Sequence, residues 1–244
     1  MLRGLCAASA AAFVAFVCAA APCPAEPAAE TSFELIRPLG DVYDERSTDG
    51  DAYPPSLAAK LLLARGDFAM SLQYWRNVYR TESAGAGSLT RYARIEGGFG
   101  TATPFIARDS SFEAHLGYRI ARSAPLYAGI GVVRTWTNYH YPVLTGVGAG
   151  LELRAAQSAG LRPFVSAFYY PSASGTYVTE SAPARTLHPL FGIVKADFGV
   201  VLRGARSPVF VLAGDSQEVR TGHALPGDVR FIRSDPYLGI GARL

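Results

Sequence analysis

Charged residues alternate with apolar residues along several stretches of the chain, which places the charges together on one face of an extended strand. Glu113 and His115, for example, alternate with Phe112, Ala114 and Leu116. Charges of both signs inside a tube of strands can form an ion path, a selectivity filter or a salt-bridge network, and the network is favoured because unpaired buried charges are costly. The inward-facing charged set predicted in this way is Arg94, Glu96, Glu113, His115, Arg119, Glu152, Arg154, Lys195 and Asp197.

The four histidines and the many serines do not stand at the spacing that nucleophilic catalysis on a strand requires. A His two residues before a Ser would share one face of a strand with it, but residues 117, 142, 190 and 225, two places after the four histidines, are not serines. A second set near the predicted rim has the residue types for acid–base hydrolysis of lipid or peptide, although their spacing matches no known motif. These residues are His188, Asp215, Glu218, His223 and Asp228. Catalysis is therefore not expected.

No metal, cofactor or nucleic-acid site is expected either. No two histidines or carboxylates stand at a compact ligand spacing on one strand face, and the acidic stretch 41–51 lacks the regular carboxylates of a calcium loop. The glycine-rich stretches 85–87 and 146–150 are not followed by the Lys-Ser/Thr of a phosphate loop. The formal net charge of +3 is too small to favour nucleic acid.

The first 25 residues have the pattern of a cleaved signal peptide. Arg3 supplies the positive start, an Ala-rich apolar stretch follows, and small residues precede a cleavage site after Ala25. Cleavage there removes Cys6, Cys18 and Cys23 and leaves no thiol for disulfides or thiol chemistry. No later apolar run is long enough for a transmembrane helix, so a membrane-embedded chain would have to cross with strands.

Alternation of apolar with polar or small residues predicts nine strands. A tenth, from 32–43 or 56–65, is required if both ends of the chain lie on one side of a closed barrel. Of these two, 56–65 favours a short helix with Ser56 as its N-cap. Recurrent motifs such as "ARSAP" and "ARSP" predict short turns near 84–88, 122–125, 156–160 and 204–207. The nine strands are about 68–80, 89–102, 111–121, 125–139, 145–155, 161–171, 190–203, 208–220 and 231–244.

Three features favour a membrane barrel over a soluble sandwich. One strand face is aliphatic or Phe, the opposite face carries charges and glycines, and aromatic residues gather near strand ends, as in interfacial girdles. The predicted interfacial aromatics are Tyr74, Trp75, Trp136, Tyr139, Tyr141 and Tyr169. From about residue 68 to the end, the chain resembles the small outer-membrane β-barrel proteins of diderm bacteria. That class usually ends in Phe, whereas this chain ends in Leu244.

The sequence therefore predicts an all-β, closed, antiparallel, up-and-down transmembrane β-barrel of ten strands, with eight or twelve also open. The predicted division is a signal peptide (1–25), an N-terminal segment with a possible first strand and short helix (26–66), and the barrel (67–244). The expected location is the outer membrane with both termini periplasmic. The expected role is non-enzymatic, structural or surface-interacting, with a plugged, charged lumen. A narrow porin-like channel for small solutes, a rim-sited lipid or peptide hydrolase and a soluble periplasmic binding barrel are the alternatives.

The expected partners follow from this location: outer-membrane lipid, the outer-membrane assembly machinery and lipopolysaccharide. Arginine outnumbers lysine in this chain, and its planar guanidinium group suits bidentate binding of phosphate. The arginines expected at the outer rim, where they would meet lipopolysaccharide phosphates, are Arg108, Arg134, Arg185, Arg220 and Arg230.

Overall fold

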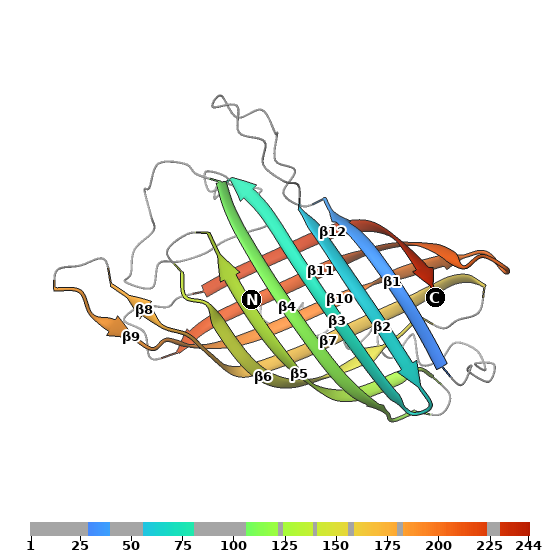
Figure 1. Cartoon of the computed structure of the whole chain (residues 1–244), viewed down its shortest axis with the longest axis horizontal. Helices are drawn as coiled ribbons and strands as arrows, with labels where there is room; N and C mark the ends of the chain where they lie inside the picture. Colours follow the sequence, from blue (N-terminus) through green and yellow to red (C-terminus); the bar gives the residue numbers. More distant parts are fainter. Residues whose placement is uncertain are drawn as a thin grey trace, which may run out of the picture.

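The computed structural model describes residues 29–39, 56–80, 106–121, 124–138, 141–155, 159–179, 183–223 and 230–244. Twelve strands and no helix are found in this part of the chain (Figure 1). None of its segments is a helix long and apolar enough to cross a membrane. The strands are β1 (Ala29–Pro38), β2 (Leu57–Arg65), β3 (Phe68–Arg80), β4 (Ile106–Arg119), β5 (Leu126–Thr137), β6 (Leu144–Leu153), β7 (Gly160–Ser174), β8 (Tyr177–Val178), β9 (Thr186–Leu187), β10 (Leu190–Arg203), β11 (Val209–His223) and β12 (Arg230–Arg243).

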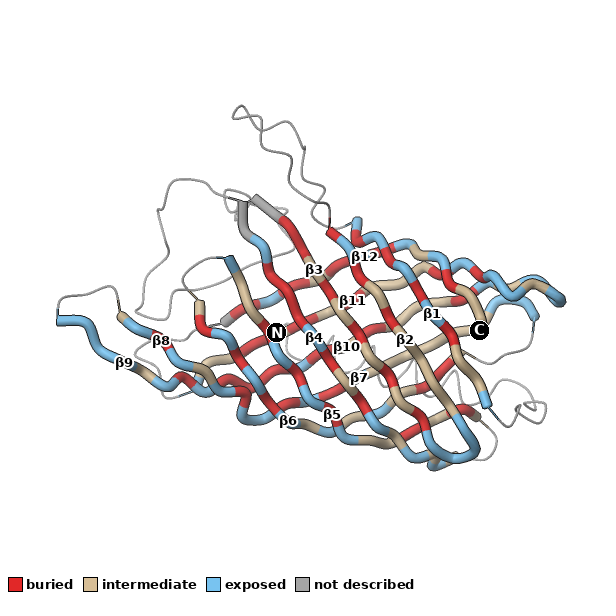
Figure 2. The backbone as a smooth tube through the Cα atoms, viewed as in Figure 1, coloured by how far each residue is buried: buried red, intermediate tan, exposed pale blue. Residues whose placement is uncertain are grey.

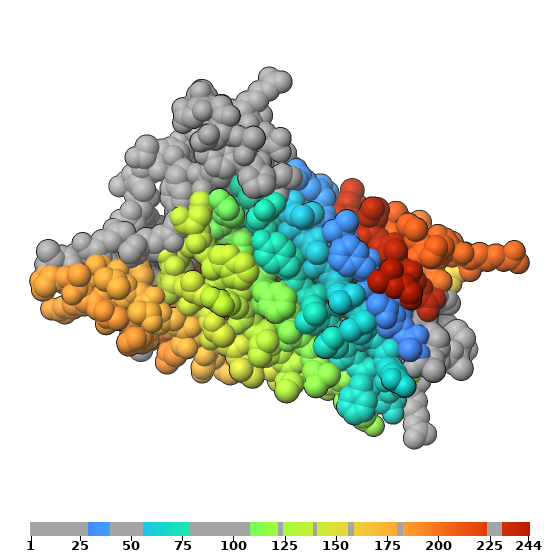
Figure 3. Space-filling view, viewed as in Figure 1, coloured from blue at the N-terminus to red at the C-terminus, as the bar shows by residue number. Residues whose placement is uncertain are grey.

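Ten of these strands form a closed antiparallel barrel. Each pairs with its neighbour in the sequence, except that β7 pairs with β10 because β8 and β9 form a separate small sheet between them. Pairing of β1 with β12, from Ser32↔Arg243 to Pro38↔Tyr237, closes the ring. The strands are tilted, as closure requires, and β8 and β9 extend beyond the end opposite the C-terminus (Figures 1 and 3). The prediction of an all-β, closed, up-and-down antiparallel barrel of ten strands is confirmed.

The two faces of the barrel wall differ as the alternation predicts. Buried and exposed residues alternate along the strands (Figure 2). Phe112 and Leu116 on β4 point outward and are exposed, whereas Glu113 and His115 point into the barrel and are buried. The outward face is thus mainly apolar, and most of the buried charges lie in the interior.

The predicted helix at 56–65 is wrong, because this stretch forms strand β2. Its Ala, Leu and Lys residues favour a helix locally, but pairing with β1 on one side and β3 on the other overrides that preference. Ser56 is not a helix cap. Its hydroxyl accepts a hydrogen bond from the Val78 backbone N–H at 2.9 Å, near the end of β3.

The barrel starts earlier in the chain than predicted, at Ala29, because both candidates for the tenth strand, 32–43 and 56–65, contribute one. The predicted strand 89–102 and the turn near 84–88 lie outside the described residues. Strands β3 and β4 pair directly with each other up to Arg80↔Ile106. The ten strands of the ring are therefore β1 and β2 together with eight of the nine strands predicted by alternation.

The short connections, the start of β1 and the end of β12 all lie at the same end of the barrel, which is named here the turn end. The opposite end is named the loop end. The connections β4–β5, β6–β7 and β10–β11 at the turn end agree with three of the predicted turns. The turn between β2 and β3 was missed, although it contains Gly66 with φ +59°.

Replacing Gly66 by Ala is expected to destabilise the barrel by about 1 kcal/mol, because a Cβ at this left-handed backbone position is strained although the surrounding space is open. The free energy of unfolding in urea measures the effect. Gly204→Ala, in another turn and without a positive φ, is the control and should change stability by less than about 0.5 kcal/mol. Equal effects at both positions would contradict this explanation.

Candidate functional site: the charged lumen

The loop-end half of the lumen is filled by a buried cluster of arginines and acids, named here the loop-end cluster: Asp109, Glu218, Arg220, Arg233 and Asp235. Arg220 donates to Asp109 at 2.9 Å and to Glu218 at 2.5 Å. Arg233 donates to the other Glu218 oxygen at 2.8 Å and also pairs with Asp235. The ring of Phe231 lies against both guanidinium groups. Each buried charge thus meets an opposite charge, which makes its burial tolerable.

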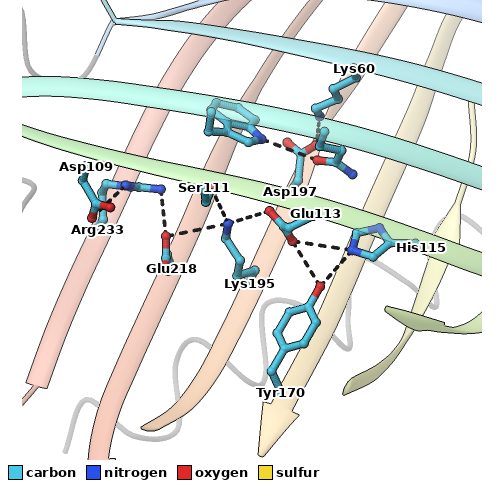
Figure 4. A network of polar contacts seen from close by, with 12 residues as sticks. Lys60, Asp109, Ser111, Glu113, His115, Tyr170, Lys195, Asp197, Glu218 and Arg233 are labelled. Carbon is cyan, nitrogen blue, oxygen red and sulfur yellow. Dashed lines mark hydrogen bonds and ion pairs between the residues drawn. The ribbon is translucent and has the colours of Figure 1, made fainter. Parts of the chain in front are cut away.

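A second group, the central cluster, continues from the first (Figure 4). Lys195 lies 3.9 Å from Glu218 and donates to Glu113 at 2.5 Å. Tyr170 donates to Glu113 at 3.2 Å, and its hydroxyl is 2.8 Å from Nε2 of His115. Side chains from β4, β7, β10 and β11 therefore form one polar network across the interior.

Ser71 and His115 form a pair that the sequence search missed, because the two residues lie on neighbouring strands. Ser71 Oγ is 3.0 Å from Nδ1 of His115, and the His115 ring stacks on Phe168 with 3.7 Å between centroids. Both polar side chains are buried. The cavity beside His115 measures about 10 Å³, too little for more than about one water molecule. A substrate has no room there, so the pair can hold the strands together and share a proton within the network.

A third group, the turn-end cluster, surrounds Lys60. Its ammonium group donates to Asp197, which also accepts a hydrogen bond of 2.6 Å from Tyr237. The rings of Trp75, Phe164 and Tyr237 lie between 5.3 and 5.6 Å from the Lys60 nitrogen, within cation–π range. Aromatic faces and one carboxylate thus replace the water that Lys60 loses on burial.

The pair Glu152 and Arg154 lies near the turn-end cluster and lines the same cavity as Lys60 and Asp197. Arg154 donates to Glu152 at 2.8 Å through Nε and to the carbonyls of Leu63 and Met70 through its terminal nitrogens. The guanidinium group therefore ties the end of β6 to β2 and β3.

The structure joins some of the predicted charged residues and separates others. Glu113, His115 and Lys195 belong to the central cluster and Asp197 to the turn-end cluster. Arg119 lies at the turn end, where it donates to the Ala121 carbonyl. Arg94 and Glu96 lie outside the described residues.

Sequence reasoning missed much of the network: Ser71, Asp109, Tyr170, Arg220, Arg233, Asp235 and Tyr237, together with Lys60. Glu218 was considered only as a rim residue for catalysis, and Arg220 only as an outer-rim arginine. A signal was present for some of them. Glu218 and Arg220 are two residues apart on β11 and therefore face the same side of that strand, and the same holds for Arg233, Asp235 and Tyr237 on β12. For Lys60 there was none, because its segment was interpreted as a helix.

The predicted interfacial aromatics fall into two groups. Tyr74 and Trp136 stack on the outer face with 6.2 Å between centroids, and Tyr169 is also exposed. Trp75 is only 2% exposed and lies inside beside Lys60, so its prediction as an interfacial residue is wrong. The error is one of parity, since adjacent strand residues face opposite sides. Tyr141 packs against Phe191 of a buried cluster rather than outward, and Tyr139 lies outside the described residues.

The rim residues considered for catalysis do not come together as a set. Asp215 faces outward, where it accepts hydrogen bonds from Ser234 and Gln217, whereas Glu218 is buried in the loop-end cluster. His188 and His223 are exposed, and Asp228 lies outside the described residues. In the described part of the chain no three His, Cys, Asp or Glu residues are grouped so that they could hold a metal ion.

The fold and the lumen define a closed ten-stranded antiparallel barrel whose interior carries buried, paired charges. Comparison of the chain with protein-family models and with curated proteins finds no match in either. What the protein does must therefore be inferred from the barrel itself.

Proposed function

We propose that this chain is an outer-membrane β-barrel protein with a plugged, charged lumen and a non-enzymatic structural or surface-interaction role. One observation carries the proposal: the polarity of the wall is the reverse of that of a water-soluble barrel. Arg220, Arg233 and Glu218 are buried inside, while large apolar side chains such as Val147, 65% exposed, and Ile130, 61% exposed, cover the outside. Apolar surface of this extent is stable against lipid, and a closed ring leaves no unpaired strand edge in it.

The aromatic pairs on the outer face also support a lipid membrane around the barrel. Tyr74 and Trp136 stack toward the loop end, and Phe68 and Tyr118 meet edge to face at the turn end, 5.4 Å apart. Amphipathic rings at both limits of an apolar belt are typical of the two membrane interfaces. With the loop end facing outward from the cell, the start of β1 and the end of β12 both lie on the periplasmic side. Insertion requires β1 and β12 to be kept from other strands until they pair, so the outer-membrane assembly machinery is a proposed partner.

Lipopolysaccharide is a further proposed partner. Arg108 and Arg134 are exposed on β4 and β5, close in register to Trp136, and Arg185 is exposed beyond the barrel. Arg108 lies beyond Trp136 toward the loop end, whereas Arg134 pairs with Phe112 and is level in register with Tyr74. Guanidinium groups at or just beyond an aromatic belt are suited to lipid phosphates. Arg220 does not belong to this set, because its side chain is buried in the lumen, and nothing is described of the Arg230 side chain.

A plugged lumen is tested by conductance. The purified barrel in planar bilayers is expected to show no discrete current steps, and Glu113→Gln should not create them, because paired side chains and aromatic rings still occupy the interior. The matched variant Asp215→Asn removes a charge from the outer face. Steps in the wild-type protein that change in size when Glu113 or Lys195 is neutralised would establish the narrow channel instead.

A further inference from the structure

A second interior feature lies between the turn-end cluster and the open turn end. A cavity of about 80 Å³ reaches from Glu34, Lys60 and Asp197 to Arg162, Arg203 and Arg243 at the ends of their strands. One water molecule requires about 10–15 Å³ on this measure, so the cavity has room for several waters or a small organic molecule. Leu62, Phe164, Val201 and Phe210 give it a largely apolar wall.

Glu34 lies at the inner end of this cavity. Its side chain is only 7% exposed, and it makes no hydrogen bond or ion pair with any other described residue. Lys60 is its register partner on β2, but the Lys60 ammonium is already bound to Asp197. With both acids ionised, these three groups together carry one negative charge more than positive. A buried carboxylate that faces a cavity without a hydrogen-bonded cation is costly unless it takes up a proton or a ligand supplies the cation.

The mouth of the cavity has the opposite charge. Arg162, Arg203 and Arg243 line it, with Glu30 as the acid among them, 3.8 Å from Arg243. Arg243 is the register partner of Ser32, two residues before Glu34 on β1, which corresponds to about 7 Å along the strand. Positive charge at the mouth and negative charge at the inner end are thus separated by about the length of a small molecule.

We propose that this cavity binds a small zwitterion, such as an amino acid, with its ammonium group on Glu34 and its carboxylate at the mouth arginines. The apolar wall then packs against the carbon chain that joins the two charges. A simple cation is repelled by the arginines at the mouth, and a simple anion is repelled by Glu34, so both charges of the ligand are required. The site opens at the turn end and does not depend on a path through the plugged half of the lumen.

Calorimetric titration of the full chain, refolded in detergent micelles, tests the proposal. The probes are glycine, 4-aminobutanoate, butylammonium and butanoate, the last two carrying only one of the charges. At least one zwitterion is expected to bind saturably, about tenfold or more tightly than either single-charge probe. Absence of saturable binding by both zwitterions, or equal binding of butanoate, would overturn the proposal.

Two variants locate the two ends of the ligand. Glu34→Gln is expected to weaken zwitterion binding by about tenfold, whereas Asp215→Asn, the same change on the outer face, should leave it unaltered. Arg162→Gln is expected to weaken the zwitterion but not butylammonium, and Arg65→Gln, at an exposed turn-end position that does not line the cavity, is its control. Heat-modifiable migration confirms that each variant is folded. Wild-type affinity in folded Glu34→Gln would place the ligand elsewhere and refute the site. Because the assay is done in detergent, its failure leaves the proposed membrane location unaffected.

Discussion

Replacing Arg233 by Met is expected to lower the free energy of unfolding of the barrel by about 3–5 kcal/mol, because it removes the cation from buried ion pairs and leaves their carboxylates in place. Arg233 pairs with Glu218, Asp109 and Asp235, and these carboxylates remain buried without it. Methionine has a volume close to that of arginine but is shorter, so most of the loss reports the charge rather than a cavity. Urea unfolding followed by fluorescence of Trp75 and Trp136 measures it.

Two further variants separate this explanation from a general effect of mutation. Arg108→Met, the same change at an exposed outward position, should alter stability by less than about 0.5 kcal/mol. Adding Asp235→Asn to Arg233→Met should restore about 1 kcal/mol or more, because it removes the buried negative charge that pairs with Arg233 Nε in the wild type. A stability of Arg233→Met equal to that of wild type would mean that the loop-end cluster does not hold the barrel together.

Arginine in place of Leu116 is expected to cost about 2–4 kcal/mol when the barrel is folded in lipid vesicles, because a charged side chain would face hydrocarbon. Leu116 is 52% exposed on the outer face and lies between Phe112 and Tyr118, which are also outward. Leu151 and Val200 occupy comparable outward positions and should respond in the same way. Reversible unfolding of the vesicle-bound protein in urea provides the measurement.

The control for this prediction is Ile120→Arg. Ile120 also faces outward but follows β4 at the turn end, where a guanidinium group reaches the interface, so the expected cost is about 0–1 kcal/mol. A uniform small cost at all these sites, with no dependence on their place along the strand, would indicate that water and not lipid surrounds the wall.

Sequence alone was sufficient for the architecture because alternation is imposed by strand geometry. On β4 every second side chain from Phe112 to Ile120 is outward and exposed or partly so, while Glu113 and His115 are inside. The errors came where local preference and tertiary structure disagree. Residues 57–65 have a helical composition but become a strand because β1 and β3 both pair with them.

The lumen was predicted less completely than the fold. Alternation identifies which charges face inward, but it does not reveal which strands lie across the barrel from one another. Lys195 and Glu113 are 82 residues apart, and Lys60 and Asp197 are 137 apart. Such pairs follow from the register and closure of the whole ring, which a single strand does not encode. The cavity at Glu34 likewise depends on side chains from strands on opposite sides of the ring.

The most direct test of the central claim is fractionation of cells that express the protein, followed by electrophoresis in SDS with and without boiling. A barrel in the outer membrane should be recovered in that membrane fraction, require detergent for extraction, and migrate faster unboiled than boiled because the closed sheet resists SDS. Recovery as a soluble monomer without detergent would contradict the proposed location and would make the exposed apolar wall a surface for some other partner.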